Sequence, residues 1–231
     1  MYCQNSFLKG QTVPTLLPNS RPELRAQLLA DRAAWLATPA SHAAAAGLGA
    51  RLQQLLAQIE PQCLGLYWPL EGEFNAAEAL AGRALSEDHA LSAPLALEAD
   101  EDEGLDGEDA DEDRAPRAPV VWALPYAFKS PRRMDYRRWD GGAPGLTDEC
   151  GIASSSGAPL VPDVVLVPCV GFTREGYRLG YGGGYFDRWL AAHPGVTSIG
   201  LAWSISETHF PVEAHDQALT LILTEKEAIM P

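Results

Sequence analysis

One segment of this chain combines charge and glycine in a pattern suited to binding an anion. It reads Arg178-Leu-Gly-Tyr-Gly-Gly-Gly-Tyr-Phe-Asp187, with four glycines in five consecutive positions. Because glycine has no Cβ and adopts positive φ readily, successive backbone N–H groups can turn toward one anion. A short helix is expected over residues 187–192, and its N-terminus would add further N–H donors. The pattern therefore indicates a phosphate-binding loop.

Two known phosphate-loop templates do not account for this segment. A P-loop requires Lys and then Ser or Thr after its last glycine, whereas Tyr185-Phe186 follows here. A Rossmann fingerprint that began at Gly180 would require glycine at position 185. A glycine-rich turn without a ligand is the alternative. Arg178 and Asp187 favour a binding site, because a bare turn needs neither.

Helices and short apolar strands alternate along the chain, which predicts an α/β fold: a three-layer, mostly parallel sheet flanked by helices. Its length of 231 residues fits a single domain. Ser20-Arg-Pro-Glu23 is a capping box that predicts a first helix with Arg21 and Arg25 on one face. Residues 134–139 are interpreted as a mixed loop. Further helices are expected over 43–58 and 76–85, and strands over 63–68, 90–97, 119–125, 163–167, 198–203 and 219–223.

The acidic character of the chain is concentrated in one stretch. Residues 98–113 contain eleven acidic side chains and no basic ones, and supply most of the net charge of −14. With almost nothing apolar to bury, this stretch predicts a disordered insertion at about 98–118. A partner-binding or calcium-binding tract is the alternative. Residues 1–19 have one lysine and no long apolar core, so a flexible leader is expected there, before a single domain over 20–231.

Several classes of site are not indicated by the sequence. The four cysteines form no CxxC pair, and the five histidines form no zinc-type cluster, which fits a reducing cytosol. The alanine-rich stretch 33–50 is interrupted by proline and glycine, so no membrane partner is expected. The arginines are dispersed in an acidic chain, so no nucleic-acid partner is expected.

The glycine segment resembles the signature of the 5-formyltetrahydrofolate cyclo-ligase (5,10-methenyltetrahydrofolate synthetase) family, Arg-Leu-Gly-x-Gly-x-Gly-Tyr-Tyr-Asp, with Phe186 at the second tyrosine. The resemblance continues in the family's order over residues 20–95 and 118–226, and such agreement is more specific than one glycine run. The further matching segments are Arg21-Pro-Glu-Leu-Arg25, Tyr67-Trp-Pro-Leu-Glu-Gly-Glu73-Phe-Asn75, Pro162-Asp163 with Phe172, Met134–Trp139, Pro211 to Asp216, and Leu219 to Glu225.

This resemblance implies a monomeric cytoplasmic ligase of one-carbon metabolism. The enzyme would use ATP and Mg²⁺ to cyclise 5-formyltetrahydrofolate, with or without a polyglutamate tail, to 5,10-methenyltetrahydrofolate, and would release ADP and phosphate. In that reaction the formyl oxygen attacks the γ-phosphoryl group, and a neighbouring nitrogen then closes the ring as phosphate leaves. No protein nucleophile is therefore expected, and Arg178 and Tyr185 would act by positioning.

Matching positions one by one implies a site with an ATP end and a folate end. Asp187 and Asp216 would bind the metal through hard oxygen ligands, although Asp187 could equally be a first-turn or capping acid of a helix. Trp139 joins Trp68 as a weak aromatic candidate. The implied ATP-binding residues are Arg21, Arg25, Arg178, Gly180, Tyr181, Gly182, Gly183, Gly184, Tyr185 and Phe186. The implied folate-binding residues are Trp68, Glu73, Tyr181, Gly182, Gly183, Gly184 and Tyr185.

Three departures from the family pattern accompany these matches. Arg21 stands where lysine is usual, which replaces a point charge by a fork of donors. Gly183 stands where some members carry lysine, and residues 152–155 replace a common Ile-x-Glu-Pro. A family-like protein that binds folate or nucleotide without turnover is the alternative function. Retention of Arg25, Glu73, Arg178 and Asp187 together argues against that alternative.

Overall fold

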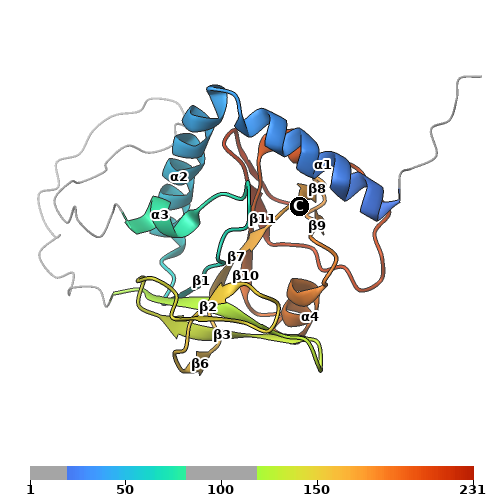
Figure 1. The fold of residues 1–231 in the computed structure, drawn as a ribbon. Coiled ribbons are helices and arrows are strands. Elements are labelled where there is room, and N and C mark those ends of the chain that lie inside the picture. The colour runs from blue at the N-terminus through green and yellow to red at the C-terminus, as the bar shows by residue number, and fades with distance from the viewer. Residues whose placement is uncertain (1–19, 82–118) are drawn as a thin grey trace, which may run out of the picture.

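The computed structural model describes residues 20–81 and 119–231, which build an α/β fold around an eight-stranded sheet (Figure 1). The strand order is β12-β11-β10-β7-β1-β2-β3-β6. The five strands from β11 to β2 are parallel, and antiparallel strands extend both edges. The strands are β1 (Cys63–Gly65), β2 (Val121–Phe128), β3 (Arg133–Trp139), β6 (Pro159–Leu160), β7 (Val164–Pro168), β10 (Thr197–Leu201), β11 (Leu221–Leu223) and β12 (Ala228–Ile229).

Helices cover both faces of the sheet, as the alternation of elements predicted. Successive strand residues point to opposite faces, so in β7 Leu166 packs in the same core cluster as Leu48 and Leu52 of α2. Val165 packs instead with Trp189 of α4 on the other face. Figure 1 shows α2 and α3 on one side of the sheet and α4 on the other. The helices are α1 (Arg21–Leu36), α2 (Ala40–Ile59), α3 (Ala76–Ala81), α4 (Tyr185–Ala192) and a 3-10 turn, η1 (Ser204–Ser206).

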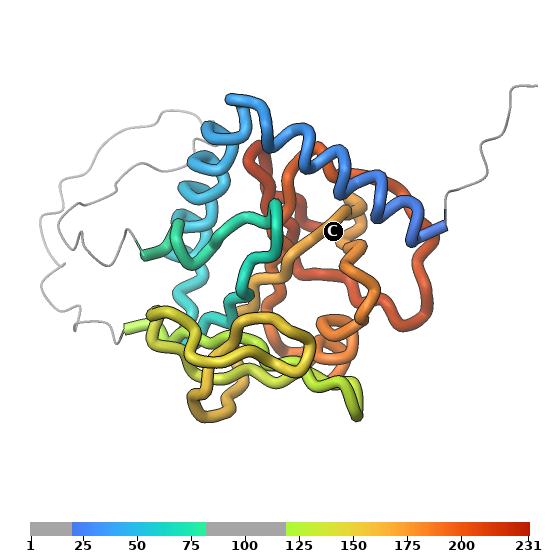
Figure 2. The backbone as a smooth tube through the Cα atoms, viewed as in Figure 1, coloured from blue at the N-terminus to red at the C-terminus, as the bar shows by residue number. Residues whose placement is uncertain are grey.

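Helix α1 begins at the predicted capping box and lies over the chain that follows β7. The Ser20 N–H donates to Glu23 Oε2 at 2.9 Å, which anchors the first turn. Leu28 then packs against Val170 and Leu179, in a third apolar cluster. In the backbone trace of Figure 2, α1 (blue) passes close to the orange segment that includes the glycine loop. The same helix therefore reaches both the core and the candidate site.

Two small hairpins complete the described fold. β4 (Leu146–Thr147) pairs with β5 (Ala153–Ser154), and β8 (Gly171–Phe172) pairs with β9 (Arg178–Leu179). The second hairpin leads directly into the glycine loop and then into α4. Within residues 20–81 and 119–231, no helix has the length and apolar character needed to cross a membrane.

The main difference between prediction and structure concerns residues 134–139. The sequence predicts a loop there, but these residues form strand β3. This strand pairs with β2 over seven residues, from Trp122↔Trp139 to Phe128↔Arg133. Its buried Met134 and Tyr136 alternate with charged residues, but the arginine pair before Trp139 breaks that alternation and hides the strand period. The predicted leader 1–19, strand 90–97, insertion 98–118 and last residues of helix 76–85 lie outside the described residues.

Candidate active site

A cavity of about 680 Å³ lies at the carboxyl-terminal ends of the parallel strands. Tyr67 and Trp68 follow β1 and line it, as does Pro168 at the end of β7. Ligands of open α/β sheets bind at this edge. Every site residue expected from the sequence lines this cavity: Arg21, Arg25, Trp68, Glu73, Arg178, Gly180, Tyr181, Gly182, Gly183, Gly184, Tyr185, Phe186, Asp187 and Asp216. Trp139 does not line it and instead packs edge-on against Trp68 at 6.2 Å.

The glycine loop forms one wall of the cavity, and its conformation explains two of the glycines. Gly182 and Gly184 have φ values of +92° and +62°, a region that residues with a side chain rarely adopt. A Cβ on Gly180 would lie 2.7 Å from Nη1 of Arg178. A larger residue at this position would therefore require the Arg178 guanidinium to move.

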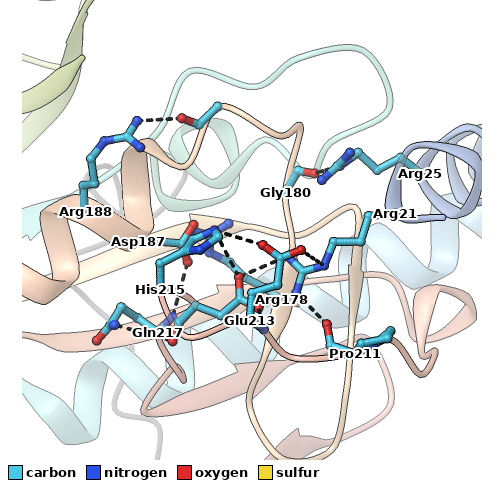
Figure 3. Close-up of polar contacts among 12 residues, drawn as sticks. Arg21, Arg25, Arg178, Gly180, Asp187, Arg188, Pro211, Glu213, His215 and Gln217 are labelled. Carbon is cyan, nitrogen blue, oxygen red and sulfur yellow. Dashed lines mark hydrogen bonds and ion pairs between the residues drawn. The ribbon is translucent and has the colours of Figure 1, made fainter. Parts of the chain in front are cut away.

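Two arginines hold carbonyl groups of this loop (Figure 3). Arg25 Nε donates to Gly180 O at 2.6 Å from helix α1, and Arg188 Nη2 donates to Gly183 O at 2.6 Å from helix α4. Charge-assisted bonds of this kind are stronger than bonds between neutral groups. Arg25 therefore has a structural task in this state of the protein, in addition to lining the cavity.

Arg178 is the most unusual charge in the cavity, because it is only 7 % exposed. Its Nη2 lies 3.1 Å from Asp187 Oδ2, an ion pair without hydrogen-bond geometry. Its Nε and Nη2 have no hydrogen-bond partner. Buried donors are nearly always paired, and Arg178 also lines the cavity, which makes its side chain a candidate contact for an anionic ligand.

Arg21 is already bound to acidic residues at the rim of the cavity. Both of its terminal nitrogens donate to the Asp216 carboxylate, and Nη2 also donates to Pro211 O at 2.7 Å. Its Nε lies 3.3 Å from Glu213 Oε1. Burial disfavours the charged form of Asp216, but bonds from Arg21 and from the Glu213 N–H keep its pKa below the usual value. Asp216 is therefore a carboxylate at neutral pH.

The two expected metal ligands are both paired with arginine. Asp187 sits in the first turn of α4 and contacts Arg178, and Asp216 accepts from Arg21. Among residues 20–81 and 119–231, no group of three or more His, Cys, Asp or Glu side chains is arranged to hold a metal ion. Mg²⁺ is commonly bound by one or two carboxylates together with substrate phosphates and waters. Asp187 and Asp216 are two carboxylates of the cavity that could contribute to such a site.

The cavity lining also includes apolar side chains and one partly buried carboxylate. Trp68, Leu70 and Met134 supply the apolar surface, and Glu73 supplies the carboxylate. Glu73 Oε2 accepts from the Leu70 N–H at 2.8 Å, whereas Oε1 is buried without a hydrogen-bond partner. Burial raises the pKa of Glu73, while the Leu70 N–H, the charge of Arg32 and the Tyr181 hydroxyl act in the opposite direction. Oε1 retains the capacity to accept a hydrogen bond.

Sequence reasoning missed several residues that shape this cavity. Asp148 is buried, and its carboxylate accepts from the N–H groups of Ala127, Cys150 and Ile152 at 2.8–3.1 Å. Asp148 thus fixes the turn that presents Cys150, whose Sγ lies 3.1 Å from Tyr185 Oη. An Asp side chain that bonds N–H groups shortly after it is a common turn device, so this signal was available. Other lining residues that were not expected are Tyr67, Arg132, Arg188, Glu213 and His215.

The unusual segment at 152–155 has a structural explanation. Ser154 Oγ donates to Pro125 O at 2.7 Å, and Ser155 Oγ donates to Arg138 O at 2.5 Å. These bonds attach the β4–β5 hairpin to β2 and β3. The two serines therefore fix this segment against β2 and β3.

Comparisons with known proteins agree with this geometry. The chain is 38 % identical over 65 residues to a 5-formyltetrahydrofolate cyclo-ligase of Mycoplasma pneumoniae, and 39 % identical over 71 residues to one of Mycolicibacterium smegmatis. These alignments cover 28 % and 29 % of this chain, and only 40 % and 36 % of the two relatives.

Solved structures support the fold over nearly the full chain. A 5,10-methenyltetrahydrofolate synthetase from Mycoplasma pneumoniae matches with a TM-score of 0.59 at 18 % identity, covering 90 % of this chain and 99 % of that one. The enzyme from Aquifex aeolicus gives 0.61 at 22 % identity, covering 91 % and 92 %. The model of the 5-formyltetrahydrofolate cyclo-ligase family matches residues 18–225. The chain therefore belongs to the 5-formyltetrahydrofolate cyclo-ligase family.

Proposed function

We propose that this protein converts 5-formyltetrahydrofolate and ATP to 5,10-methenyltetrahydrofolate, ADP and phosphate. The observation that best supports this function is that one cavity is lined by a donor side chain and an acceptor side chain that both have atoms without hydrogen-bond partners. Arg178 offers unpaired buried donors, and Glu73 offers an unpaired buried acceptor. A volume of about 680 Å³ is within the usual range for small-molecule sites. Family membership supplies the reaction that needs such a two-ended site.

At the nucleotide end, positive charge and backbone donors would bind the phosphates of ATP. Arg178 would contribute its free N–H groups, and Arg25 would hold the glycine loop in place and contribute charge. Arg21 would exchange part of its bonding to Asp216 for phosphate. Asp187 and Asp216 would contact Mg²⁺, which when bound with ATP neutralises phosphate charge.

At the folate end, the apolar wall and Glu73 would orient the pterin ring. Glu73 Oε1 would accept a pterin N–H, and Trp68 would pack against the ring face. Tyr181 and Tyr185, which line the cavity from the glycine loop, would bring the formyl oxygen to the γ-phosphoryl group. The formyl oxygen is the nucleophile, so the contribution of the protein is proximity, orientation and charge stabilisation.

The same reasoning extends to the setting of the enzyme. We infer a monomeric cytoplasmic enzyme whose partners are ATP and folate, with or without a polyglutamate tail. The acidic overall charge supports the absence of nucleic acids and membranes from these partners, because it disfavours binding to nucleic acids and anionic membranes. A non-catalytic folate- or nucleotide-binding protein would retain the pocket without product formation.

The test of this function measures the amounts of both products in the same reaction. Purified protein with 5-formyltetrahydrofolate, ATP and Mg²⁺ is expected to release ADP and the methenyl product in a one-to-one ratio. ADP release that is unaffected by omitting the folate would identify an ATPase instead. Binding of both ligands without release of either product would support the non-catalytic alternative.

Replacing Arg25 with alanine is expected to weaken ATP use by roughly 10- to 100-fold, because each charge-assisted hydrogen bond contributes about 1.5–3 kcal/mol. Folate affinity should be mostly retained, because Arg25 bonds to the loop at Gly180, which is not one of the residues assigned to folate. Arg51→Ala is the matched control, because Arg51 also donates to a backbone carbonyl, Glu225 O at 3.2 Å, but does not line the cavity. Steady-state kinetics with each substrate varied in turn makes the comparison. Equal losses in both variants would exclude a specific role for Arg25.

A further inference from the structure

Arg32 is a buried arginine of helix α1 to which the sequence assigned no role. It lies two helical turns beyond Arg25, on the same side of the helix, and is only 3 % exposed. Its Nη2 donates to Glu71 O at 2.9 Å and to Tyr181 Oη at 2.8 Å. One guanidinium therefore joins the loop before Glu73 to the glycine loop.

The backbone around Glu73 is packed directly on this guanidinium. Gly72 has a φ of +76°, and a Cβ at this position would lie 3.0 Å from Arg32 Nε. On its other side, Gly72 O accepts from Trp203 Nε1 at 3.0 Å. The loop from Glu71 to Glu73 is thus held between Arg32 and Trp203, and its fit against Arg32 depends on a glycine.

Arg32 makes no ion pair within 4.0 Å among the described residues. Burying a cation without such a partner is costly. Burial raises the pKa of Glu73, while the positive charge of Arg32 acts in the opposite direction and favours its carboxylate form. Arg32 therefore makes hydrogen bonds to Glu71 and Tyr181 and also acts electrostatically on Glu73.

We propose that Arg32 is a positioning residue that holds Glu73 and Tyr181 in the arrangement that binds folate. This proposal rests on the function proposed above and assigns its folate end a support within helix α1. Arg25 of the same helix holds Gly180, the neighbour of Tyr181. One rigid helix thus aligns the nucleotide loop and the folate-binding loop with each other.

The position of one guanidinium nitrogen is central to this role, because Nη2 makes both bonds. A lysine at position 32 would keep the charge, but its ammonium sits on a shorter, flexible stem and lacks the planar group that packs against Gly72 and fixes Nη2. A methionine would keep much of the apolar stem and remove both the charge and the donors. Tyr181→Phe removes only the hydroxyl contact. These variants separate the geometric contribution from the charge.

The test measures folate affinity without turnover, by titrating 5-formyltetrahydrofolate in the absence of ATP. Arg32→Met is expected to raise the dissociation constant roughly 10-fold, since it removes hydrogen bonds to a charged group. Arg32→Lys should recover part of the loss, and the KM for ATP should change by less than about threefold. Arg51→Met, with an exposed arginine replaced on α2, controls for the loss of an arginine as such and should bind folate normally.

A double-mutant cycle separates positioning from general stability. If Arg32 acts through Tyr181, the effects of Arg32→Met and Tyr181→Phe on folate affinity should be less than additive, because either change breaks the same bond. Two independent structural defects would instead give additive losses. Melting temperatures identify unfolded variants. If Arg32→Met does not fold, the cycle is run with Arg32→Lys, which is expected to weaken folate binding because its ammonium does not keep the position of Nη2.

A purely structural role of Arg32 would leave the pH dependence of folate binding unchanged. Measuring this pH dependence therefore provides a further test. The groups around Glu73 are Arg32 of α1, Tyr67 after β1, Cys169 after β7 and Tyr181 of the glycine loop. Burial raises the pKa of Cys169 to about 12 and the pKa of both tyrosines above the usual value. Glu73 is therefore the group in this set that titrates at acidic pH, and its midpoint should move to higher pH in Arg32→Met.

The outcomes for Arg32 and for the overall function are distinguishable. If the wild-type protein binds folate but forms no product, the proposed activity fails while the Arg32 measurements still decide the positioning role. An unchanged folate affinity in Arg32→Met, equal losses for ATP and folate, or strictly additive effects with Tyr181→Phe would each overturn the positioning role. If the wild-type protein does not bind folate at all, both proposals are contradicted.

Discussion

Replacing Arg178 with methionine should lower kcat/KM for ATP by roughly 10²- to 10⁴-fold, the largest effect expected for any single residue of the site. Two buried nitrogens of Arg178, Nε and Nη2, have no hydrogen-bond partner, although Nη2 lies 3.1 Å from Asp187 Oδ2. Two charge-assisted bonds to phosphate would together contribute about 3–6 kcal/mol to binding and transition-state stabilisation. Initial rates measured over a range of ATP concentrations give this value directly.

Loss of folding is the main competing explanation for such a result, because Arg178 is buried beside Asp187. Removing one partner of a buried ion pair leaves the other uncompensated, whereas removing both is better tolerated. The double variant Arg178→Met/Asp187→Asn should therefore melt at a higher temperature than Arg178→Met alone and still fail to use ATP. A folded Arg178→Met protein that retains ATP use within about threefold of wild type would contradict the phosphate role.

Replacing Glu73 with glutamine should raise the dissociation constant for 5-formyltetrahydrofolate by roughly 10- to 100-fold, with ATP binding retained. The variant keeps the size of the side chain but removes the charge that strengthens a hydrogen bond from the pterin. Calorimetric titration of each ligand separately makes the comparison. Glu78→Gln, an exposed change on α3 outside the cavity, is the control. Loss of ATP binding in Glu73→Gln would contradict the two-ended site.

The pH dependence of folate binding gives a second check on Glu73. Because burial raises its pKa, Glu73 gains its proton at a higher pH than an exposed glutamate. Wild-type folate binding should therefore weaken as the pH falls through this raised pKa. Glu73→Gln cannot titrate, so its remaining affinity should show no step in this range.

The sequence was most informative where local chemistry determines local structure. Ser20 and Glu23 form the predicted capping box, and the glycine loop precedes a helix as expected. The strand at 163–167 was found because a buried parallel strand is a continuous run of branched apolar residues. The residues that the matched segments indicated, apart from Trp139, line one cavity in the structure.

The parts that could not be predicted depend on contacts between distant segments. Arg32 and Tyr181 are 149 positions apart, and Arg21 and Asp216 are 195 apart. No local pattern indicates that Arg32 is buried, since its neighbours on the helix are mixed. Strand β3 was missed because its arginines stack on aromatic rings, such as Arg137 over Tyr126 at 3.7 Å, and so occupy strand positions where charge is unusual.

The central claim is that this cavity joins ATP cleavage to ring closure on folate. The most direct measurement is the ultraviolet absorbance of 5,10-methenyltetrahydrofolate in a solution of purified protein, 5-formyltetrahydrofolate and Mg²⁺, before and after ATP is added. We expect no increase before ATP and a steady increase afterwards, limited by the amount of ATP supplied. An increase that does not require ATP, or no increase although both ligands bind, would contradict the proposed function.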